Sequence, residues 1–500
     1  MSLRKRAISG AISGTIGTVL NFGQALLLVP LLLRVWGRDA YGVWVAVLAA
    51  LGVLTALDTG HQNFVGNELN RLHHLDRDAA RKILASALLV GALLGVLQLN
   101  LVLGVLATGL SEKLLGLSSG TLSAHRANIA LLILVAGWGV SGSVGGVLVR
   151  LYAPVGRFAR GQTMGIIGRL LQLAATAVMS ICGRTIVETA AVIAALSLLY
   201  TIVVVADVGK SAPEYWPWWT GPSLSLGLKN LFRSGVLLTI SVLQQLSGNG
   251  LTLLVASALS ATAIPAFATS RTIANVLTQM SNIVLQPLYP DLVRLYATKA
   301  STGLRNVMIA SWMVVTGAAV LAGVLILPIL KPTYLWWTGR LLAFDRPLIL
   351  GLIIAAMVRS VGVPFLALIA ASNRLRYQLI CVSAQVVITL LVSWALVSRF
   401  GTVGVSMGLV AGEAVGGAAL PIFVGRRSLR QIDADVAWGD VLWQCALVLV
   451  GASILVVSAW LDQSVFLAYP LMLACLLGML WRRFYGLPGS LRSALISRKR

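Results

Sequence analysis

Apolar runs of about 18 residues or more recur along this 500-residue chain from one end to the other. Each run is long enough to cross the hydrocarbon core of a bilayer as a helix, because a helix rises about 1.5 Å per residue. Only 11% of the residues are charged, against about 25% in a typical soluble protein. The sequence therefore predicts an all-α, polytopic membrane protein.

The chain contains about fourteen predicted transmembrane helices, with bounds good to about 2–4 residues. They cover residues 10–33, 41–64, 83–108, 128–149, 162–183, 186–206, 231–258, 262–289, 306–329, 347–370, 378–398, 402–424, 442–460 and 464–482. With the N-terminus in the cytoplasm, the cytoplasmic segments hold about three times as many Lys and Arg residues as the external loops. Because basic residues concentrate on the cytoplasmic side, this bias predicts a multi-pass protein with both termini inside.

The net charge of +23 has the same explanation. In a soluble protein such a charge would suggest binding to nucleic acid, but here we expect no nucleic-acid partner. The four cysteines lie in apolar segments without metal-ligand spacing, so we expect no metal site. The chain has no P-loop motif, so we expect no bound nucleotide or other cofactor. A membrane protein of this kind that moves a substrate would take its energy from the substrate's own gradient, the membrane potential or an ion gradient, and the sequence leaves both H⁺ and Na⁺ open as the coupling ion.

Two short motifs recur at similar offsets. Glu68-Leu-Asn-Arg71 follows one apolar run and Asp291-Leu-Val-Arg294 follows another, while Arg157 and the span after it match Arg374 and its following span. A six-helix unit present twice would give both copies the same orientation. We therefore predict two six-helix lobes related by a pseudo-two-fold axis along the membrane normal, with two extra C-terminal helices. The predicted parts are an N-lobe (1–206), a cytoplasmic linker (207–230), a C-lobe (231–425), and appended helices with a basic tail (426–500).

Polar side chains form helical stripes on the first two helices of each predicted lobe. Their spacing of three and four residues places them on one helix face. Such stripes avoid lipid, so they either hold helices together by hydrogen bonds or line a cavity. Matching stripes in the two halves favour a shared cavity lined by Asn21, Gln24, Gln62, Gln245, Asn249, Asn275, Thr278 and Asn282.

Three arginines fall within predicted spans, where an arginine is costly unless it has a partner or faces water. A guanidinium group in a cavity would attract a phosphate or another anion, so Arg271, Arg359 and Arg169 are candidate substrate-binding residues. Arg359 is also a candidate for a structural ion pair with Glu413, and Arg169 is close enough to the cytoplasmic edge to snorkel.

Two acidic residues are candidates for coupling to an ion. Asp58 lies beside the predicted cavity and would bind a proton or a cation, or alternatively cap a helix end. Glu413 lies in the middle of a predicted span of the second lobe.

The loops between the spans are short, which leaves no room for an extramembrane catalytic domain. We therefore expect no enzymatic activity.

The stretch from Val29 to Trp44, followed by Leu57-Asp-Thr-Gly60 and Asn67-Glu-Leu-Asn-Arg71, resembles the opening of the Wzx-type polysaccharide flippases. The second half is similar too, at Ser234-Gly235, Phe400-Gly401 and Gly404-Val405. The resemblance covers most of residues 1–425. It implies the multidrug/oligosaccharidyl-lipid/polysaccharide (MOP) exporter superfamily, with two six-helix lobes around a V-shaped central cavity and two extra helices.

The resemblance also implies a function. Such flippases move undecaprenyl-pyrophosphate-linked oligosaccharides from the cytoplasmic to the periplasmic leaflet of the bacterial inner membrane. They serve the biosynthesis of O-antigen lipopolysaccharide, capsule or exopolysaccharide, and their implied partners are membrane lipid, a polysaccharide polymerase and a chain-length regulator. The alternative is a cation-coupled exporter of drugs or metabolites from the same superfamily. That alternative requires a dominant acidic site, for which only Asp58 and Glu413 are candidates.

Overall fold

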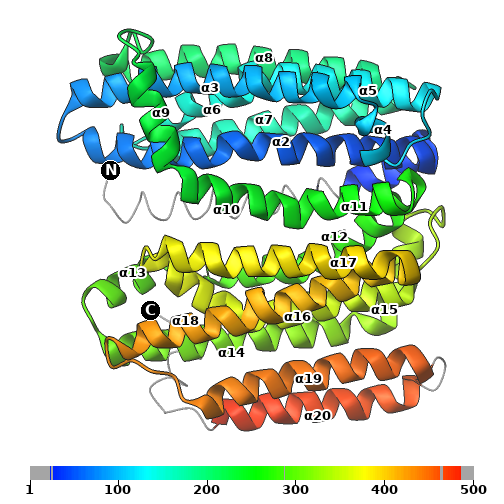
Figure 1. The fold of residues 1–500 in the computed structure, drawn as a ribbon. Helices are drawn as coiled ribbons and strands as arrows, with labels where there is room; N and C mark the ends of the chain where they lie inside the picture. Colours follow the sequence, from blue (N-terminus) through cyan, green and yellow to red (C-terminus); the bar gives the residue numbers. More distant parts are fainter. Residues whose placement is uncertain (1–22, 24–25, 286–287, 462–464, 486–500) are drawn as a thin grey trace. The chain divides into compact units, whose positions relative to one another are not determined.

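The structure is a computed structural model that describes residue 23 and residues 26–285, 288–461 and 465–485 (Figure 1). Within these residues the regular structure is entirely helical. Most of the first predicted span, 10–33, lies outside the described residues, and its described end belongs to the short helix Leu26–Val35. The all-α prediction is therefore confirmed for the part of the chain that the structure describes.

Nine helical segments of the described residues are long and apolar enough to cross a membrane, or ten if a bent pair is one span. The chain is thus a multi-pass membrane protein, while the count of fourteen stays a prediction. The nine segments are Gly37–Leu72, Arg77–Ala107, Leu122–Tyr152, Phe158–Ile181, Ile186–Ser211, Ser301–Leu325, Arg346–Ala371, Leu375–Arg430 and Trp438–Ser458. The bent pair is Leu224–Arg233 with Gly235–Ala258, which meet at 60°.

The predicted spans 378–398 and 402–424 are joined without a loop. Helix α17 (Leu375–Gly412), the π-helix η7 (Glu413–Ala419) and α18 (Leu420–Arg430) follow one another directly. The chain bends at Gly401, whose φ of 56° and ψ of −136° are not helical. Glycine adopts this backbone conformation readily because it has no Cβ. A bend at one glycine therefore replaces the connecting loop that the sequence predicted.

By its internal contacts the chain divides into unit 1 (Met1–Ala268) and unit 2 (Thr269–Arg500). In unit 1, helix α2 (Gly37–Leu72) packs against α3 (Arg77–Ala107), α5 (Leu122–Trp138) and α10 (Gly235–Gln245). Helices α7 (Phe158–Ile181) and α8 (Ile186–Ser211) pack against each other, and α8 also packs against α5. Helix α2 is therefore at the centre of unit 1, and its neighbours position the side chains that surround it.

In unit 2, helix α16 (Arg346–Ala371) has the corresponding central place. It packs against α14 (Ser301–Leu325), α17, η7 and α18. The two helices predicted as an appended pair are α19 (Trp438–Leu461) and α20 (Val465–Tyr485), which pack against each other and against α14. Shorter helices that the sequence did not predict include α4 (Leu110–Leu114), α9 (Leu224–Arg233), α13 (Tyr289–Ala297) and α15 (Leu327–Trp337).

Both recurring motifs make the same interactions in the two units. Arg71 pairs with Glu68 at 2.6 Å, and Arg294 pairs with Asp291 at 2.9 Å. Arg157 Nη1 donates to Ser211 Oγ at 3.0 Å, and 217 residues later Arg374 Nη1 donates to Ser428 Oγ at 3.0 Å. These contacts support a duplicated unit, while the symmetry of the two predicted lobes and the four predicted parts stay predictions.

We expect Gly60→Ala to destabilise the protein. A Cβ at Gly60 would lie within 3.0 Å of backbone atoms of Leu237 and Leu238 in α10, so the helices would have to separate. Overpacking of this kind costs about 1–3 kcal/mol. In a thermal unfolding experiment in detergent, the midpoint should fall for Gly60→Ala. Gly104→Ala is the matched control, because a Cβ there meets no atom within 4 Å; an equal fall in both variants would contradict the close contact.

Candidate functional site

Asp58 lies in α2 with only 1% of its surface exposed. Its Oδ2 accepts three hydrogen bonds, from Gln98 Nε2 at 2.8 Å, Trp138 Nε1 at 2.7 Å and Ser143 Oγ at 2.9 Å. The donors come from α3, α5 and the π-helix η1 (Gly139–Val144). A buried carboxylate requires such donors, because an unpaired charge in an apolar interior is very costly. The alternative that Asp58 caps a helix end is therefore wrong, since it lies in the interior of α2 and accepts from side chains of neighbouring helices.

The other oxygen of this carboxyl group lacks such donors within the described part of the chain. Asp58 Oδ1 is buried and has no hydrogen-bond partner among the described residues. An oxygen of this kind is the natural place for a proton or a cation, because either would compensate its burial. The geometry therefore suits the coupling role considered for Asp58.

A second polar contact joins α2 to the same π-helix. Gln62 Nε2 donates to the carbonyl oxygen of Gly142 at 2.9 Å, and a Cβ at Gly146 would collide with the Gln62 amide. Wide π-helical turns often occur at functional sites in helices. In this structure Gln62, predicted to line a cavity, holds two helices together, which is the alternative reading of a polar stripe.

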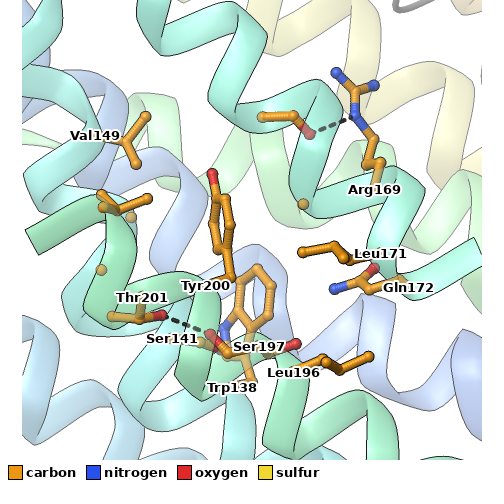
Figure 2. Close-up of a pocket in the computed structure, with 15 residues that line it drawn as sticks. Trp138, Ser141, Val149, Arg169, Leu171, Gln172, Leu196, Ser197, Tyr200 and Thr201 are labelled. Carbon is orange, nitrogen blue, oxygen red and sulfur yellow. Dashed lines mark hydrogen bonds between the residues drawn. The ribbon is translucent and has the colours of Figure 1, made fainter. Parts of the chain in front are cut away.

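A cavity of about 320 Å³ lies in unit 1 between α7, α8 and the segment that contains η1 (Figure 2). Arg169 lines it, and Figure 2 shows the guanidinium at one side with Tyr200 and Trp138 opposite. Arg169 Nε donates to the carbonyl oxygen of Gly165 at 3.2 Å. Trp138 lines this Arg169 cavity and also donates to Asp58, so one side chain links the buried acid to the cavity wall.

In unit 2, the ion pair expected between Arg359 and Glu413 is present at 3.0 Å. Glu413 Oε1 also accepts from Gln385 Nε2 at 2.7 Å, while Oε2 is buried and has no hydrogen-bond partner among the described residues. Arg271 on α12 (Ile264–Leu285) interacts electrostatically with both Arg359 and Glu413. Two of the predicted arginines and one predicted acid thus form one cluster.

The remaining predicted site residues are distributed over both units. Asn249 Nδ2 donates to Gln245 Oε1 at 2.8 Å, and Asn282 Nδ2 donates to Gln279 Oε1 at 3.3 Å. Asn275 is exposed and Thr278 is half-buried, both on α12. Asn21 and Gln24 lie outside the described residues.

Sequence reasoning missed one unusual residue of this region. His61 follows Asp58 by three residues on α2 and is 1% exposed, and neither ring nitrogen has a hydrogen-bond partner among the described residues. The signal was present, because spacings of three and four residues join Asp58, His61 and Gln62 to the polar stripe. The donors to the two acids, such as Trp138 and Gln385, were also missed, because no spacing rule shows which side chains meet between helices.

A scan of protein-family models gives no match to this chain, and no curated protein sequence matches it either. Solved structures do match. A structure of the lipid II flippase MurJ in an inward closed conformation aligns with a TM-score of 0.66 and 14% identity, over 96% of this chain and 99% of that one. An inward-facing multidrug resistance MATE family transporter of the MOP superfamily aligns with a TM-score of 0.61 and 17% identity, over 83% and 99%.

A third match is a MOP superfamily transporter from Pyrococcus furiosus, whose reported binding pocket has reversed polarity. It aligns with a TM-score of 0.55 and 17% identity, over 86% of this chain and 96% of that chain. This chain has the fold of the MOP superfamily transporters. At these identities the likeness establishes the fold, and it agrees with the superfamily that the sequence resemblance implied.

We expect Asp58→Leu to lower the free energy of unfolding by about 2 kcal/mol or more, because it leaves the buried donors Gln98, Trp138 and Ser143 without their acceptor. Asp58→Asn retains an acceptor oxygen and should cost less. Thermal unfolding in detergent measures the difference between the two variants. Equal midpoints would show that the three hydrogen bonds do not stabilise the bundle.

We expect Arg359 and Glu413 to be energetically coupled. In a double-mutant cycle of Arg359→Gln and Glu413→Gln, the coupling should be about 1–3 kcal/mol. It should stay below the cost of breaking a fully buried ion pair, because the Arg359 side chain is 33% exposed. The cycle is measured by chemical unfolding, and additive single effects would mean that the pair contributes no net stability.

Proposed function

We propose that this protein is a flippase for undecaprenyl-pyrophosphate-linked oligosaccharides. It moves repeat units from the cytoplasmic to the periplasmic leaflet of the bacterial inner membrane by alternating access, with both of its termini in the cytoplasm. The glycan then enters O-antigen, capsule or exopolysaccharide synthesis, where a polymerase and a chain-length regulator are the expected partners. In this proposal the protein is a transporter that has neither enzymatic activity nor a cofactor.

One observation favours a flippase over the other transporters that share this fold. The match to the lipid II flippase covers 96% of this chain, whereas the matches to the MATE family transporter and the Pyrococcus protein cover 83% and 86%. The flippase thus accounts for a larger part of this chain. The Wzx-like motifs at the start of the chain point to the same branch of the superfamily.

The arginine cluster of unit 2 gives the proposed substrate an electrostatic partner. Arg271 and Arg359 contribute two positive charges and Glu413 one negative charge, so the cluster has a net positive charge. A pyrophosphate binds well to guanidinium groups, because their forked N–H donors match its oxygens. In the proposed role Arg271 and Arg359 neutralise the pyrophosphate, Arg169 is a further candidate for binding it, and the carboxamide side chains of the stripes bond to the sugars.

A cation-coupled exporter of drugs or metabolites is the second candidate. It is favoured by the two buried carboxyl groups, Asp58 and Glu413, each of which has one oxygen without a hydrogen-bond partner among the described residues. Either acid would take up H⁺ or Na⁺ and release it after a change of conformation. The flippase would use the same acids if it is driven by an ion gradient.

We expect Arg271→Ala to abolish flipping while leaving expression unchanged, because it removes one of the two charges that hold the pyrophosphate. The measurement is the sidedness of the lipid-linked glycan in cells that lack the protein, complemented with each variant. Arg271→Lys should restore part of the activity, since it retains the charge and loses the fork. Arg305→Ala is the matched control, because Arg305 is exposed at the start of α14.

Two outcomes would count against the proposal. Normal sidedness in cells without the protein would leave either a redundant flippase or the exporter, and dye efflux dependent on Asp58 or Glu413 is the measurement that separates them. Full flipping by Arg271→Ala would keep the flippase and remove this arginine from the site.

A further inference from the structure

A second cavity of unit 1 lies at the end of the bundle where α2 finishes. It has a volume of about 330 Å³, within the range of about 300–1,000 Å³ of small-molecule sites. Its walls come from the last turns of α2, from the turn around Arg150 and from the start of α7. In the orientation that we propose, with both termini in the cytoplasm, this end of the bundle is cytoplasmic.

The charged group of this cavity is Arg150. The side chain is half-buried, and its Nε is buried without a hydrogen-bond partner among the described residues. The neighbouring arginines are engaged, since Arg157 donates to Ser211 and Arg160 pairs with Asp207. Within the described part of the chain, no carboxylate pairs with Arg150, and neither Asp nor Glu lines the cavity. Its positive charge is therefore available to an anion.

Carboxamide groups surround this charge. Asn63, Asn67 and Asn70 follow one another at spacings of four and three residues, so they occupy one face of α2, and Gln162 contributes from α7. No hydrogen bond joins any of the four amides to another described residue. Each amide offers two donors and an acceptor, which is the pattern that binds hydroxyl groups. Phe158 adds an apolar wall and is 50% exposed.

The fold makes room for this arrangement. Gly66 lies between Asn63 and Asn67 on the same part of α2, and a Cβ there would meet the Cδ of Arg150 at 3.3 Å. The methylene groups of Arg150 therefore pack on the bare backbone of α2. Val149 lines both this Arg150 cavity and the Arg169 cavity, so the two are neighbours along the bundle.

We propose that the Arg150 cavity binds a phosphorylated, hydroxyl-bearing head group on the cytoplasmic side, with Arg150 on the phosphate and the four carboxamides on the hydroxyls. The role of the cavity in transport rests on the proposed function. In that role the cavity binds the head group of the substrate before the substrate crosses the membrane. The same chemistry comes from two sources, a sugar phosphate and the glycerol phosphate head group of an anionic lipid. In both cases the guanidinium fork provides the charge-assisted hydrogen bonds.

The test is direct binding of glucose 1-phosphate to the full-length protein in nanodiscs of phosphatidylcholine. We expect binding that falls at least tenfold in Arg150→Gln and several-fold in Asn67→Ala, whose side chain is exposed and whose fold should be intact. Arg305→Gln removes the same charge from an exposed site and should bind as the unmodified protein does. Unmodified glucose should bind far more weakly, because it offers Arg150 no anion.

A second arm separates the two sources. In nanodiscs that contain phosphatidylglycerol, loss of glucose 1-phosphate binding would assign the cavity to a lipid head group, and unchanged binding would assign it to a sugar phosphate; both support the proposal. No binding in phosphatidylcholine, or equal binding by Arg150→Gln, would overturn it. These outcomes are independent of the flippase itself: Arg150-dependent binding together with Asp58- or Glu413-dependent dye efflux and normal glycan sidedness in cells without the protein would favour the exporter and keep the cavity.

Discussion

The need to satisfy carboxylates inside an apolar bundle governs the interior of both units. Burying a charge is tolerable only where hydrogen-bond donors converge on it, because water is excluded. Asp58 meets this condition by drawing donors from α3, α5 and η1, and Glu413 by drawing them from α16 and α17. Each of these two acids therefore helps to fix the relative positions of the helices around it.

Glycines and widened helical turns provide the space that these acids require. Glu413 is the first residue of the π-helix η7, and a Cβ at Gly417 would lie within 3.0 Å of the Glu413 Oε2 atom. Ser143, one of the donors to Asp58, belongs to the π-helix η1. A regular helix with larger side chains would close on these carboxyl groups. The irregular segments are thus part of how the buried charges are accommodated.

The fold class was predictable because apolar runs and their lengths depend only on local composition. The same reasoning located Asp58, Glu413 and the arginines, since a charge within a span is visible in the sequence. It paired Arg359 with Glu413 because few charges exist there to pair. It did not find Trp138 or Gln385, whose roles depend on which faces of two helices meet. It also expected a break between two spans where Gly401 provides only a bend.

The offset of 217 residues that relates Arg157 to Arg374 and Ser211 to Ser428 also relates positions elsewhere in the two units. Gly168, Leu196 and Tyr200 line the Arg169 cavity of unit 1. Adding 217 to their numbers gives Gln385, Glu413 and Gly417, which are the residues of the buried acid network and its close-packed glycine. In unit 1 these positions line a cavity, whereas in unit 2 they form a buried network of charged and polar side chains. If the two units are copies of one helical repeat, the same positions form an accessible cavity in one copy and a stabilising charge network in the other.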